Sequence, residues 1–361
     1  MKPKRIVMFG AGAVGGYVGA HLGQQGYDVT LVDFWHDHIE AIRARGLEIS
    51  GLTAEEHQIV QVRTMHLHEV STLCSRDPID IAFVSVKSYD TEWITTLLRQ
   101  YLAPGGFVVS LQNCINEERI AAIVGWGRTV GCIASQISVE LSEPGRIRRQ
   151  VAKGSKDHVV FRVGEVHGRI TRRVSELAEM LMAVDGAKAT TNLWGERWSK
   201  LCQNGMKNGI SAATGLTSKE IDRNEATRRF SIRLGGEGVR IGQALGFALE
   251  KIGKLDPDRL AQAAEGEPAA LREVEGLLVE SAGSSGRGEQ QRPSMGQDII
   301  KGRRTEIEFI NGFIARKGAE IGIAAPANAR LTNLVQAVEC GEIAPSPRTI
   351  AEIEPPDAGR V

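Results

Sequence analysis

Short apolar runs alternate with amphipathic stretches along the first half of the chain. Residues 5–9 read RIVMF and residues 28–33 read DVTLVD, as expected of parallel strands covered on both faces. The stretches 17–26 and 36–45 that follow these runs have the pattern of helices. The alternation continues with a strand, a helix, a strand and a helix predicted at 81–86, 90–101, 107–111 and 117–124. This order predicts an α/β fold with a Rossmann-type doubly wound sheet.

The second half of the chain shows long helical segments and few strand signals, of which 192–214 and 222–245 are the clearest. A length of 361 residues also favours two domains. We therefore expect a dinucleotide-binding Rossmann domain over residues 1–188 and an all-helical substrate and catalytic domain over 189–345. The proline-containing tail, 346–361, is predicted to be poorly ordered.

Residues 255–292 form a long insert that is rich in Glu, Ala, Gly and Ser. Within it, the stretch 281–293 is predicted to be a mobile loop. Composition alone leaves two interpretations open, a lid over a binding site and a surface insertion.

Composition and charge narrow the choice of partners and compartment. The 44 basic and 44 acidic residues balance, so the overall charge attracts neither nucleic acid nor an anionic membrane. The N-terminal apolar run is too short for a signal sequence or a membrane span. The cysteines lack the spacing of a disulfide framework or a zinc site, and no metal is expected; they are Cys74, Cys114, Cys132, Cys202 and Cys340. We therefore expect a cytoplasmic protein.

A glycine motif of the form G-x-G-x-x-G follows the first predicted strand directly and opens a helix. Its first glycine permits a tight turn, its second lets the backbone approach a pyrophosphate, and its third allows close packing of helix and strand. The helix N-terminus then offers N–H groups to the anion. The expected cofactor-binding residues are Gly10, Ala11, Gly12, Ala13, Val14 and Gly15.

Asp33 ends the second predicted strand, where a carboxylate can accept hydrogen bonds from the adenosine ribose hydroxyls. The same charge repels a 2′-phosphate, and no Lys or Arg follows before Arg43. NAD is therefore the expected cofactor and NADP is less favoured. Phe34 and Trp35 either flank the adenine or pack within the fold.

A stripe of polar side chains runs along the predicted helix 192–214. Lys200, Asn204 and Asn208 occur at i, i+4 and i+8, which places an ammonium and two carboxamides on one helix face. Such a stripe is either a solvated face or part of a site.

Several motifs occur in the order found in one enzyme family. After the glycine motif they read Val86-Lys87-Ser-Tyr-Asp90, Gln112-Asn113, Trp198-x-Lys200-Leu-x-x-Asn204-x-x-x-Asn208, Ser294-Met295-x-x-Asp298 and Thr305-Glu306-Ile-x-x-Ile-Asn311-Gly312. The chain resembles the ketopantoate reductase (2-dehydropantoate 2-reductase) family from residue 5 to about residue 338.

The resemblance implies hydride transfer between a nicotinamide cofactor and a 2-oxo or 2-hydroxy acid, such as 2-dehydropantoate or pantoate of pantothenate biosynthesis. It implies Lys200 as the general acid and Glu306 as a contact of the substrate hydroxyl and the lysine. Asn204, Asn208 and Ser294 match positions that hold the substrate. Asn113 matches a position near the nicotinamide ribose and the substrate, and Lys87 one near the cofactor. The family also implies a homodimer.

The sequence departs from the family pattern at two site positions. Cys114 stands where the family commonly has a glycine, and no His/Asn arrangement supports a nucleophilic role for this thiol. Asp33 stands where familiar members carry a basic residue and use NADPH, which favours an NAD-linked reaction here. Two alternatives stay open: a related dehydrogenase with another hydroxy or oxo substrate, and a non-catalytic NAD-binding sensor.

Overall fold

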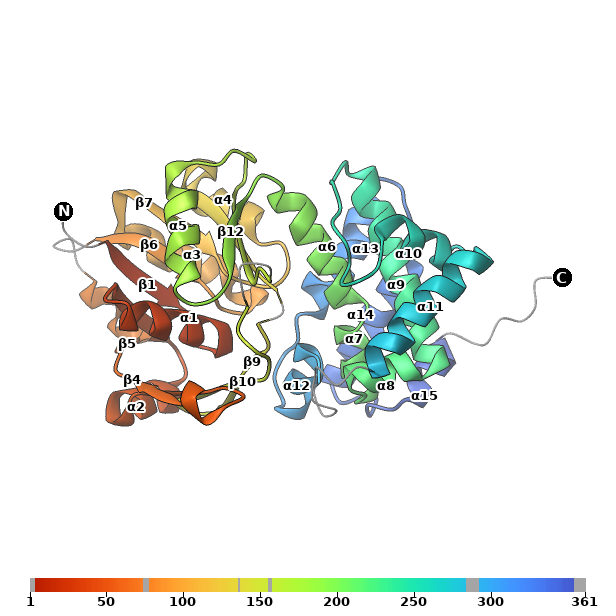
Figure 1. Ribbon diagram of the computed structural model, residues 1–361, viewed down its shortest axis with the longest axis horizontal. Helices are drawn as coiled ribbons and strands as arrows, with labels where there is room; N and C mark the ends of the chain where they lie inside the picture. Colours follow the sequence, from red (N-terminus) through yellow and green to blue (C-terminus); the bar gives the residue numbers. More distant parts are fainter. Residues whose placement is uncertain (1–3, 74–77, 136, 155–157, 284–291, 354–361) are drawn as a thin grey trace. The chain divides into compact units, whose positions relative to one another are not determined.

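The computed structural model describes residues 4–73, 78–135, 137–154, 158–283 and 292–353. The chain divides into two compact units, Met1–Leu193 and Trp194–Val361 (Figure 1). This boundary lies five positions beyond the expected one at residue 188.

The first unit alternates strands and helices. Its elements are β1 (Arg5–Phe9), α1 (Ala13–Gln24), β2 (Asp28–Asp33), α2 (His36–Arg45), β3 (Leu47–Ser50), η1 (Ala54–Glu56), β4 (Gln58–Val60), β5 (Arg63–His66), η2 (Leu67–Thr72), β6 (Ile79–Val84), η3 (Ser88–Asp90), α3 (Thr91–Leu98), η4 (Arg99–Tyr101), β7 (Leu102–Ser110), α4 (Glu117–Val124), η5 (Trp126–Arg128), β8 (Thr129–Ala134), β9 (Val139–Glu143), β10 (Arg146–Arg149), β11 (Phe161–Glu165), α5 (Arg172–Met182) and β12 (Ala187–Thr190).

Eight strands form the main sheet, in the order β12-β11-β8-β7-β6-β1-β2-β5. Every neighbouring pair is parallel except β8 and β11. The chain goes from β1 to β2 on one side and later returns to β6 on the other, so the loop after β1 lies where the strand order reverses. Open α/β sheets bind ligands at this point, and the predicted doubly wound sheet is confirmed.

Both faces of the main sheet are covered, which explains its uninterrupted apolar strands. Ile6 and Met8 of β1 join the core beneath α1 and α5, whereas Val7 and Phe9 join the core beneath α3 and α4. All four side chains are fully buried. The central strand is therefore held rigidly beneath the loop that follows it.

A second sheet of four strands, in the order β4-β3-β10-β9, packs against α1 and was not predicted. Its strands β9 and β10 read VELSE and RIRR, and they lack the apolar runs that marked the main sheet. Strand β3 pairs in parallel with β10, far along the chain, so no local turn signal reveals the pairing.

The second unit is helical in its described part. Its elements are α6 (Leu193–Gly205), α7 (Asn208–Thr214), α8 (Ser218–Arg223), α9 (Glu225–Ala244), α10 (Pro257–Ala264), α11 (Pro268–Gly283), α12 (Ser294–Ile300), η6 (Ile307–Phe309), α13 (Asn311–Glu320), α14 (Pro326–Glu339) and α15 (Arg348–Ile353). Helix α9 packs against α10, α13 and α14. Glycines on α9 permit close approach: a Cβ at Gly242 would come within 2.4 Å of the buried Trp198 ring.

One prediction for this unit is corrected, and another lies mostly outside the described residues. Most of the insert 255–292 is helical, since α10 and α11 pack against α9 and against each other. The loop predicted at 281–293 includes residues 284–291, which lie outside the described residues. The tail begins with α15, which packs against α7 and α9 and buries Ile350 completely. The composition of the tail did not reveal this helix, because a helix held by tertiary packing needs little intrinsic helix propensity.

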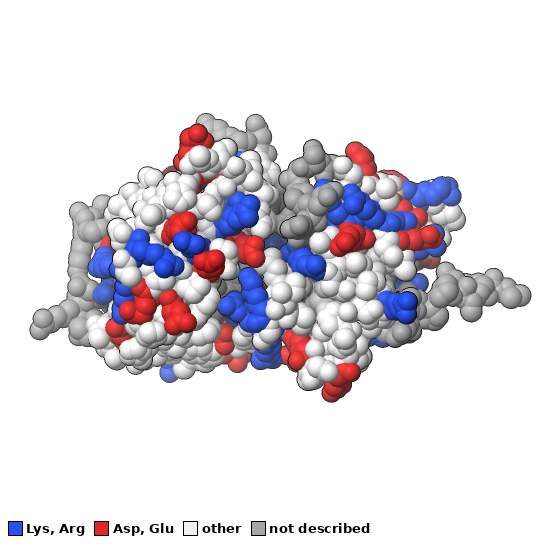
Figure 2. All heavy atoms as spheres, turned by 90° about the horizontal axis from the view of Figure 1, so that it is seen from below, with Lys and Arg blue, Asp and Glu red and all other residues white. Residues whose placement is uncertain are grey.

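The described parts of the chain contain no helix long and apolar enough to cross a bilayer. On the face shown in Figure 2, basic and acidic side chains are interspersed over each unit, in keeping with the balanced composition.

Candidate cofactor and catalytic sites

The glycine loop after β1 is fixed by close backbone contacts. Gly10 has φ +98°, and a Cβ there would lie 2.7 Å from the carbonyl carbon of Ser85, at the end of the neighbouring β6. A Cβ at Gly15 would lie 2.0 Å from the carbonyl oxygen of Gly10. These two positions therefore require glycine for the turn and for the packing of α1 on β1.

Gly12 differs from its two partners. A Cβ built there meets no atom within 4 Å, so the backbone faces open space at the N-terminus of α1. The first turn of α1 runs through Ala13 and Val14 and carries no acidic side chain that would repel an anion. An open backbone beside free helix N–H groups fits a dinucleotide pyrophosphate.

Asp33 supports this loop from the end of β2. Its Oδ2 accepts a hydrogen bond from the backbone N–H of Ala11 at 2.7 Å, and its Oδ1 accepts one from Trp35 at 2.9 Å. A carboxylate oxygen has two acceptor sites. Asp33 can therefore hold the loop and also accept a ribose hydroxyl.

His38 is a loop contact that sequence reasoning missed. Its Nε2 lies 2.9 Å from the carbonyl oxygen of Ala11, and its Nδ1 accepts from the backbone N–H of Gly145 at 2.9 Å. Nε2 must therefore carry the proton and donate to Ala11. Burial lowers the pKa of His38, which favours this neutral form. Since Gly145 lies far along the chain, no local signal could have revealed the contact.

The loops after β6 and β7 are tied together at the same edge of the sheet. Gln112 donates from Nε2 to the carbonyl oxygen of Val86 at 2.8 Å, and Asn116 donates from Nδ2 to Ser88 Oγ at 3.1 Å. Lys87 and Asn113 are half-buried members of these loops. The structure thus brings together the two loops that carry the predicted cofactor residues. The side chains that join the loops were not predicted as functional.

Cys114 occupies a backbone conformation that favours glycine. Its φ is +66°, and its side chain is buried. A side chain in the left-handed region carries strain that glycine does not. The family's glycine at this position therefore has a conformational reason, and this chain accommodates a cysteine there.

The predicted helix 192–214 is corrected by the structure. Helix α6 ends at Gly205 and α7 begins at Asn208, so Lys200 and Asn204 share a helix while Asn208 opens the next one. Asn311 donates from Nδ2 to the carbonyl oxygen of Gly205 at 3.0 Å, which satisfies a backbone group at the end of α6. Periodicity alone could not show this break, because its stabilising partner comes from α13.

Two of the predicted substrate residues meet at the starts of α7 and α12. Asn208, at the start of α7, donates from Nδ2 to Ser294 Oγ at 3.3 Å, at the start of α12. A Cβ at Gly296 would come within 2.3 Å of Ser211 Oγ, so these two helices pack closely. Two of the predicted substrate positions are therefore brought together.

The predicted catalytic pair lies in the same helical unit. Lys200 is half-buried on α6, between residues whose side chains are in the core, Trp198 and Leu201. Glu306 is 4% exposed and precedes η6, five positions before Asn311. Because Asn311 bonds to Gly205, it connects the segment of Glu306 to the helix that carries Lys200.

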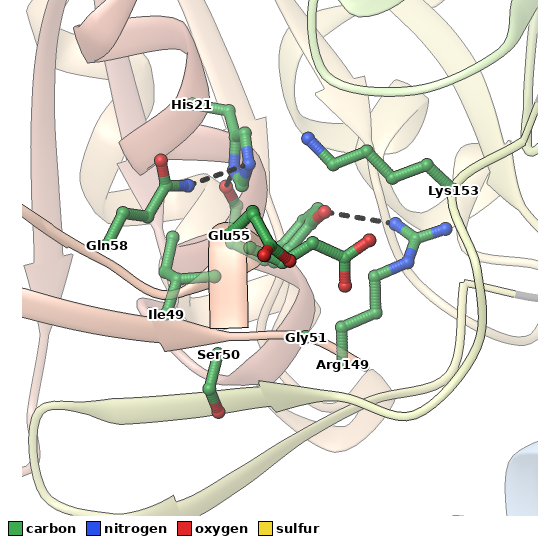
Figure 3. A pocket seen from close by; sticks show the side chains of 10 residues that line it. His21, Ile49, Ser50, Gly51, Glu55, Gln58, Arg149 and Lys153 are labelled. Carbon is green, nitrogen blue, oxygen red and sulfur yellow. Dashed lines mark hydrogen bonds between the residues drawn. The ribbon is translucent and has the colours of Figure 1, made fainter. Parts of the chain in front are cut away.

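A separate pocket of about 180 Å³ lies between α1 and the small sheet (Figure 3). Arg149 donates from its guanidinium to the Tyr17 hydroxyl at 3.0 Å and pairs with Asp185 at 2.5 Å. His21 lies against the backbone oxygen of Tyr17 at 2.8 Å, and burial lowers its pKa to about 4. The bond from Arg149 to Tyr17 joins β10 of the small sheet to α1.

The chain matches known proteins over nearly its whole length. Residues 6–159 match the family model for ketopantoate reductase PanE/ApbA, and residues 192–339 match the model for its C-terminal part. A 2-dehydropantoate 2-reductase from Archaeoglobus fulgidus is 30% identical over 355 residues, 94% of this chain and 100% of that protein. The chain belongs to the ketopantoate reductase family. It is accordingly an oxidoreductase that acts on CH–OH groups with a nicotinamide cofactor.

Solved structures of similar proteins share the fold. A PanE/ApbA family ketopantoate reductase from Ralstonia eutropha JMP134 has a TM-score of 0.74 at 26% identity, with 94% of this chain and 99% of that chain covered. D-mandelate dehydrogenase with NADH and anilino(oxo)acetate has a TM-score of 0.76 at 24% identity, with 93% and 98% covered. The fold of ketopantoate reductases thus also serves a dehydrogenase with another named substrate.

Proposed function

We propose that the protein transfers hydride between NAD(H) and a 2-oxo or 2-hydroxy acid of the 2-dehydropantoate/pantoate type. The observation that carries the proposal is the position of Asp33, whose carboxylate is hydrogen-bonded to the glycine loop at the end of β2. A fixed negative charge there favours a ribose diol over a 2′-phosphate. Arg43, the first Lys or Arg after Asp33 in the sequence, is paired with Glu40 and Glu69.

The reaction needs a proton donor at the substrate oxygen. When bound, the nicotinamide supplies the hydride at its C4 in the direction of reduction. As the carbonyl carbon gains the hydride, its oxygen gains negative charge, and we assign Lys200 to donate the proton to it. Glu306 orients the lysine and the nascent hydroxyl, while Asn204, Asn208 and Ser294 hold the substrate. The contact between Asn208 and Ser294 supports that grouping.

Two loop residues complete the proposed cofactor site. Lys87 and Asn113 lie in loops held together by Gln112 and Asn116, at the edge of the sheet where the glycine loop lies. We assign Lys87 to the cofactor and Asn113 to the nicotinamide ribose and the substrate.

Steady-state rates test the proposal directly. Purified enzyme would be assayed with NADH and with NADPH on 2-dehydropantoate and a series of other 2-oxo acids. We expect K200A to lower kcat by about a hundredfold or more, whereas K254A, on an exposed lysine of the same unit, leaves it unchanged. The assignment would be refuted if the enzyme turned over no substrate with either cofactor, or if K200A had a normal rate.

The cofactor preference has its own test. In D33A the ratio of kcat/KM with NADH to that with NADPH should fall by about tenfold or more, because the repelling charge is gone. The ratio is the informative quantity, since loss of the bond to Ala11 weakens the binding of NADH and of NADPH alike. An unchanged ratio would overturn the proposed role of Asp33.

A second candidate is a related dehydrogenase with a bulkier substrate. It is favoured by the similarity to D-mandelate dehydrogenase and tested by 2-oxo acids with aromatic side chains. The third, a non-catalytic NAD-binding sensor, predicts nucleotide binding without any turnover.

We further propose a homodimer in the cytoplasm. A ketopantoate reductase from Staphylococcus aureus described as dimeric shares the fold, with a TM-score of 0.67 at 17% identity and 94% of this chain covered. The cysteines in the described residues are free thiols, as in a reducing compartment. Sedimentation analysis of the purified protein tests the dimer.

A further inference from the structure

Histidines gather at the outer part of the main sheet, at the ends of β2 and β5. Helix α2 begins with HDHIE at residue 36, and the end of β5 continues as HLHE from residue 66. Asp33 and His66 are register partners in the pairing of β2 with β5. The sheet therefore brings together two segments that lie about thirty positions apart.

Three of these side chains converge. His36, Glu40 and His66 each place one ligand-type atom within 4.8 Å of the others. His36 and Glu40 are four positions apart on α2 and so point from the same helix face. His66 Nε2 already lies 2.7 Å from Glu40 Oε1. Two imidazoles and a carboxylate thus surround one small volume.

A third imidazole, that of His68, lies against this group. The rings of His36 and His66 stack with centroids 4.9 Å apart, and those of His66 and His68 stack at 5.2 Å. Protonated imidazoles at these distances repel one another, so a stack of three is not an ordinary surface feature.

We propose that His36, Glu40 and His66 form a binding site for a divalent transition-metal ion of the zinc class. Imidazole and carboxylate ligands suit zinc, and three protein ligands with an open fourth position are a recurrent arrangement. The fourth position is left for a water molecule or another ligand. Nothing in the proposed hydride transfer requires this site.

The ligand spacing fits with a modest adjustment. Tetrahedral zinc with bonds of about 2.0–2.1 Å places its ligand atoms about 3.3 Å apart, closer than the 4.8 Å within which these atoms lie. His36 can supply that movement, because its side chain is 72% exposed at the start of α2. His66 is 6% exposed and contacts Glu40, so these two ligands can stay in place while His36 moves.

Neighbouring charges act in both directions. Arg43 lies 3.1 Å from Glu40, and its positive charge opposes a cation. Glu69 pairs with Arg43 at 2.5 Å, and Asp37 lies 3.6 Å from His36. The negative charges of these two carboxylates offset the positive charge of Arg43. The site should therefore bind a metal with micromolar rather than picomolar strength.

Calorimetric titration of the chelator-treated full chain with Zn²⁺ alone tests the site. We expect one Zn²⁺ per chain at this site, with a Kd of about 10 µM. The variants H36A and E40Q should each weaken that binding by about tenfold or more. Both positions are exposed, so neither substitution removes core packing.

The chain offers a matched control. His57 and Glu48 also form a histidine–carboxylate pair, at 3.3 Å, on the small sheet. H57A should leave the Zn²⁺ affinity unchanged. The proposal fails if wild-type protein shows no saturable binding, if H36A or E40Q loses less than about tenfold, or if H57A weakens binding as much as they do. None of these readouts depends on enzyme activity.

Discussion

His38 donates a hydrogen bond from Nε2 to the carbonyl oxygen of Ala11, while Asp33 accepts one from the N–H of the same residue. Both backbone polar groups of one glycine-loop residue are thus held by side chains from β2 and α2. The loop does not depend on the cofactor for its shape. Such a preformed site avoids the entropic cost of ordering a loop during binding.

Removal of the His38 imidazole should weaken nucleotide binding. H38A leaves the buried carbonyl oxygen of Ala11 without this donor, at a cost of about 1–3 kcal/mol, and we expect the Kd for NADH to rise by about tenfold. H38Q, which keeps an amide donor, should lose less. Fluorescence titration measures both variants, and an unchanged Kd in folded H38A would show that the loop needs no such support.

Cys114 provides a test of backbone strain. Because its φ is +66°, C114G should be more stable than C114A by about 1 kcal/mol. At an ordinary helix or strand position the order is reversed, since glycine gains more entropy on unfolding. Both variants lack the thiol, so the difference between their free energies of unfolding in urea isolates the conformational effect. Greater stability of C114A would contradict the strain.

Asn311 should matter for the stability of the helical unit. It is fully buried and donates to the backbone of Gly205 and to Asn328. N311A leaves these acceptors unsatisfied, and we expect it to lower the free energy of unfolding by about 2 kcal/mol. N333A, an exposed position on α14, serves as the matched control and should change it by less than about 0.5 kcal/mol. If N311A and N333A changed the free energy of unfolding equally, the hydrogen bonds of Asn311 would not contribute to stability as proposed.

The buried imidazole of His21 makes stability sensitive to acid. Burial lowers its pKa from 6.5 to about 4, so between these values the unfolded chain binds a proton that the folded chain does not. The contribution of neutral His21 to the free energy of unfolding is complete above pH 6.5. It is lost as the pH falls to about 4, which lowers the free energy of unfolding by roughly 3 kcal/mol.

Unfolding in urea at pH 7.5 and at pH 4.5 measures this loss. H21Q should show a smaller decrease than wild type, whereas H57Q, at an exposed imidazole, should behave like wild type. If the free energy of unfolding of H21Q decreased as much as that of wild type, groups other than His21 would cause the acid sensitivity. His38, whose pKa is also lowered by burial, acts in the same direction and accounts for part of what remains.

The main sheet and its cofactor loop could be predicted because their signals are local. Strand β1 is apolar at every buried position, and Gly10 and Gly15 after it are required by contacts with the adjacent backbone. The small sheet could not be predicted, since three of the four residues of β10 are arginines and the strand pairs with β3, far away in the sequence.

The candidate sites divide in the same way. Lys200 and Asn204 were placed correctly on one helix, but the break before Asn208 depends on Asn311 from another helix. The histidine cluster did leave a signal, in the segments HDHIE and HLHE, yet only the pairing of β2 with β5 shows that the two segments meet. Pairing between distant segments is what sequence patterns leave undetermined.

The bond from Gly145 to His38 spans 107 positions, and it also affects how the protein matures. Chains fold from the N-terminus as they are synthesised, and contacts between distant residues form late. A nascent chain that has just completed α2 carries the glycine motif and Asp33 but not the strand pair that positions His38. We therefore expect tight nucleotide binding to arise only after β9 and β10 are made. Since a bound ligand stabilises only the form that binds it, the nucleotide would selectively protect chains whose first unit is finished.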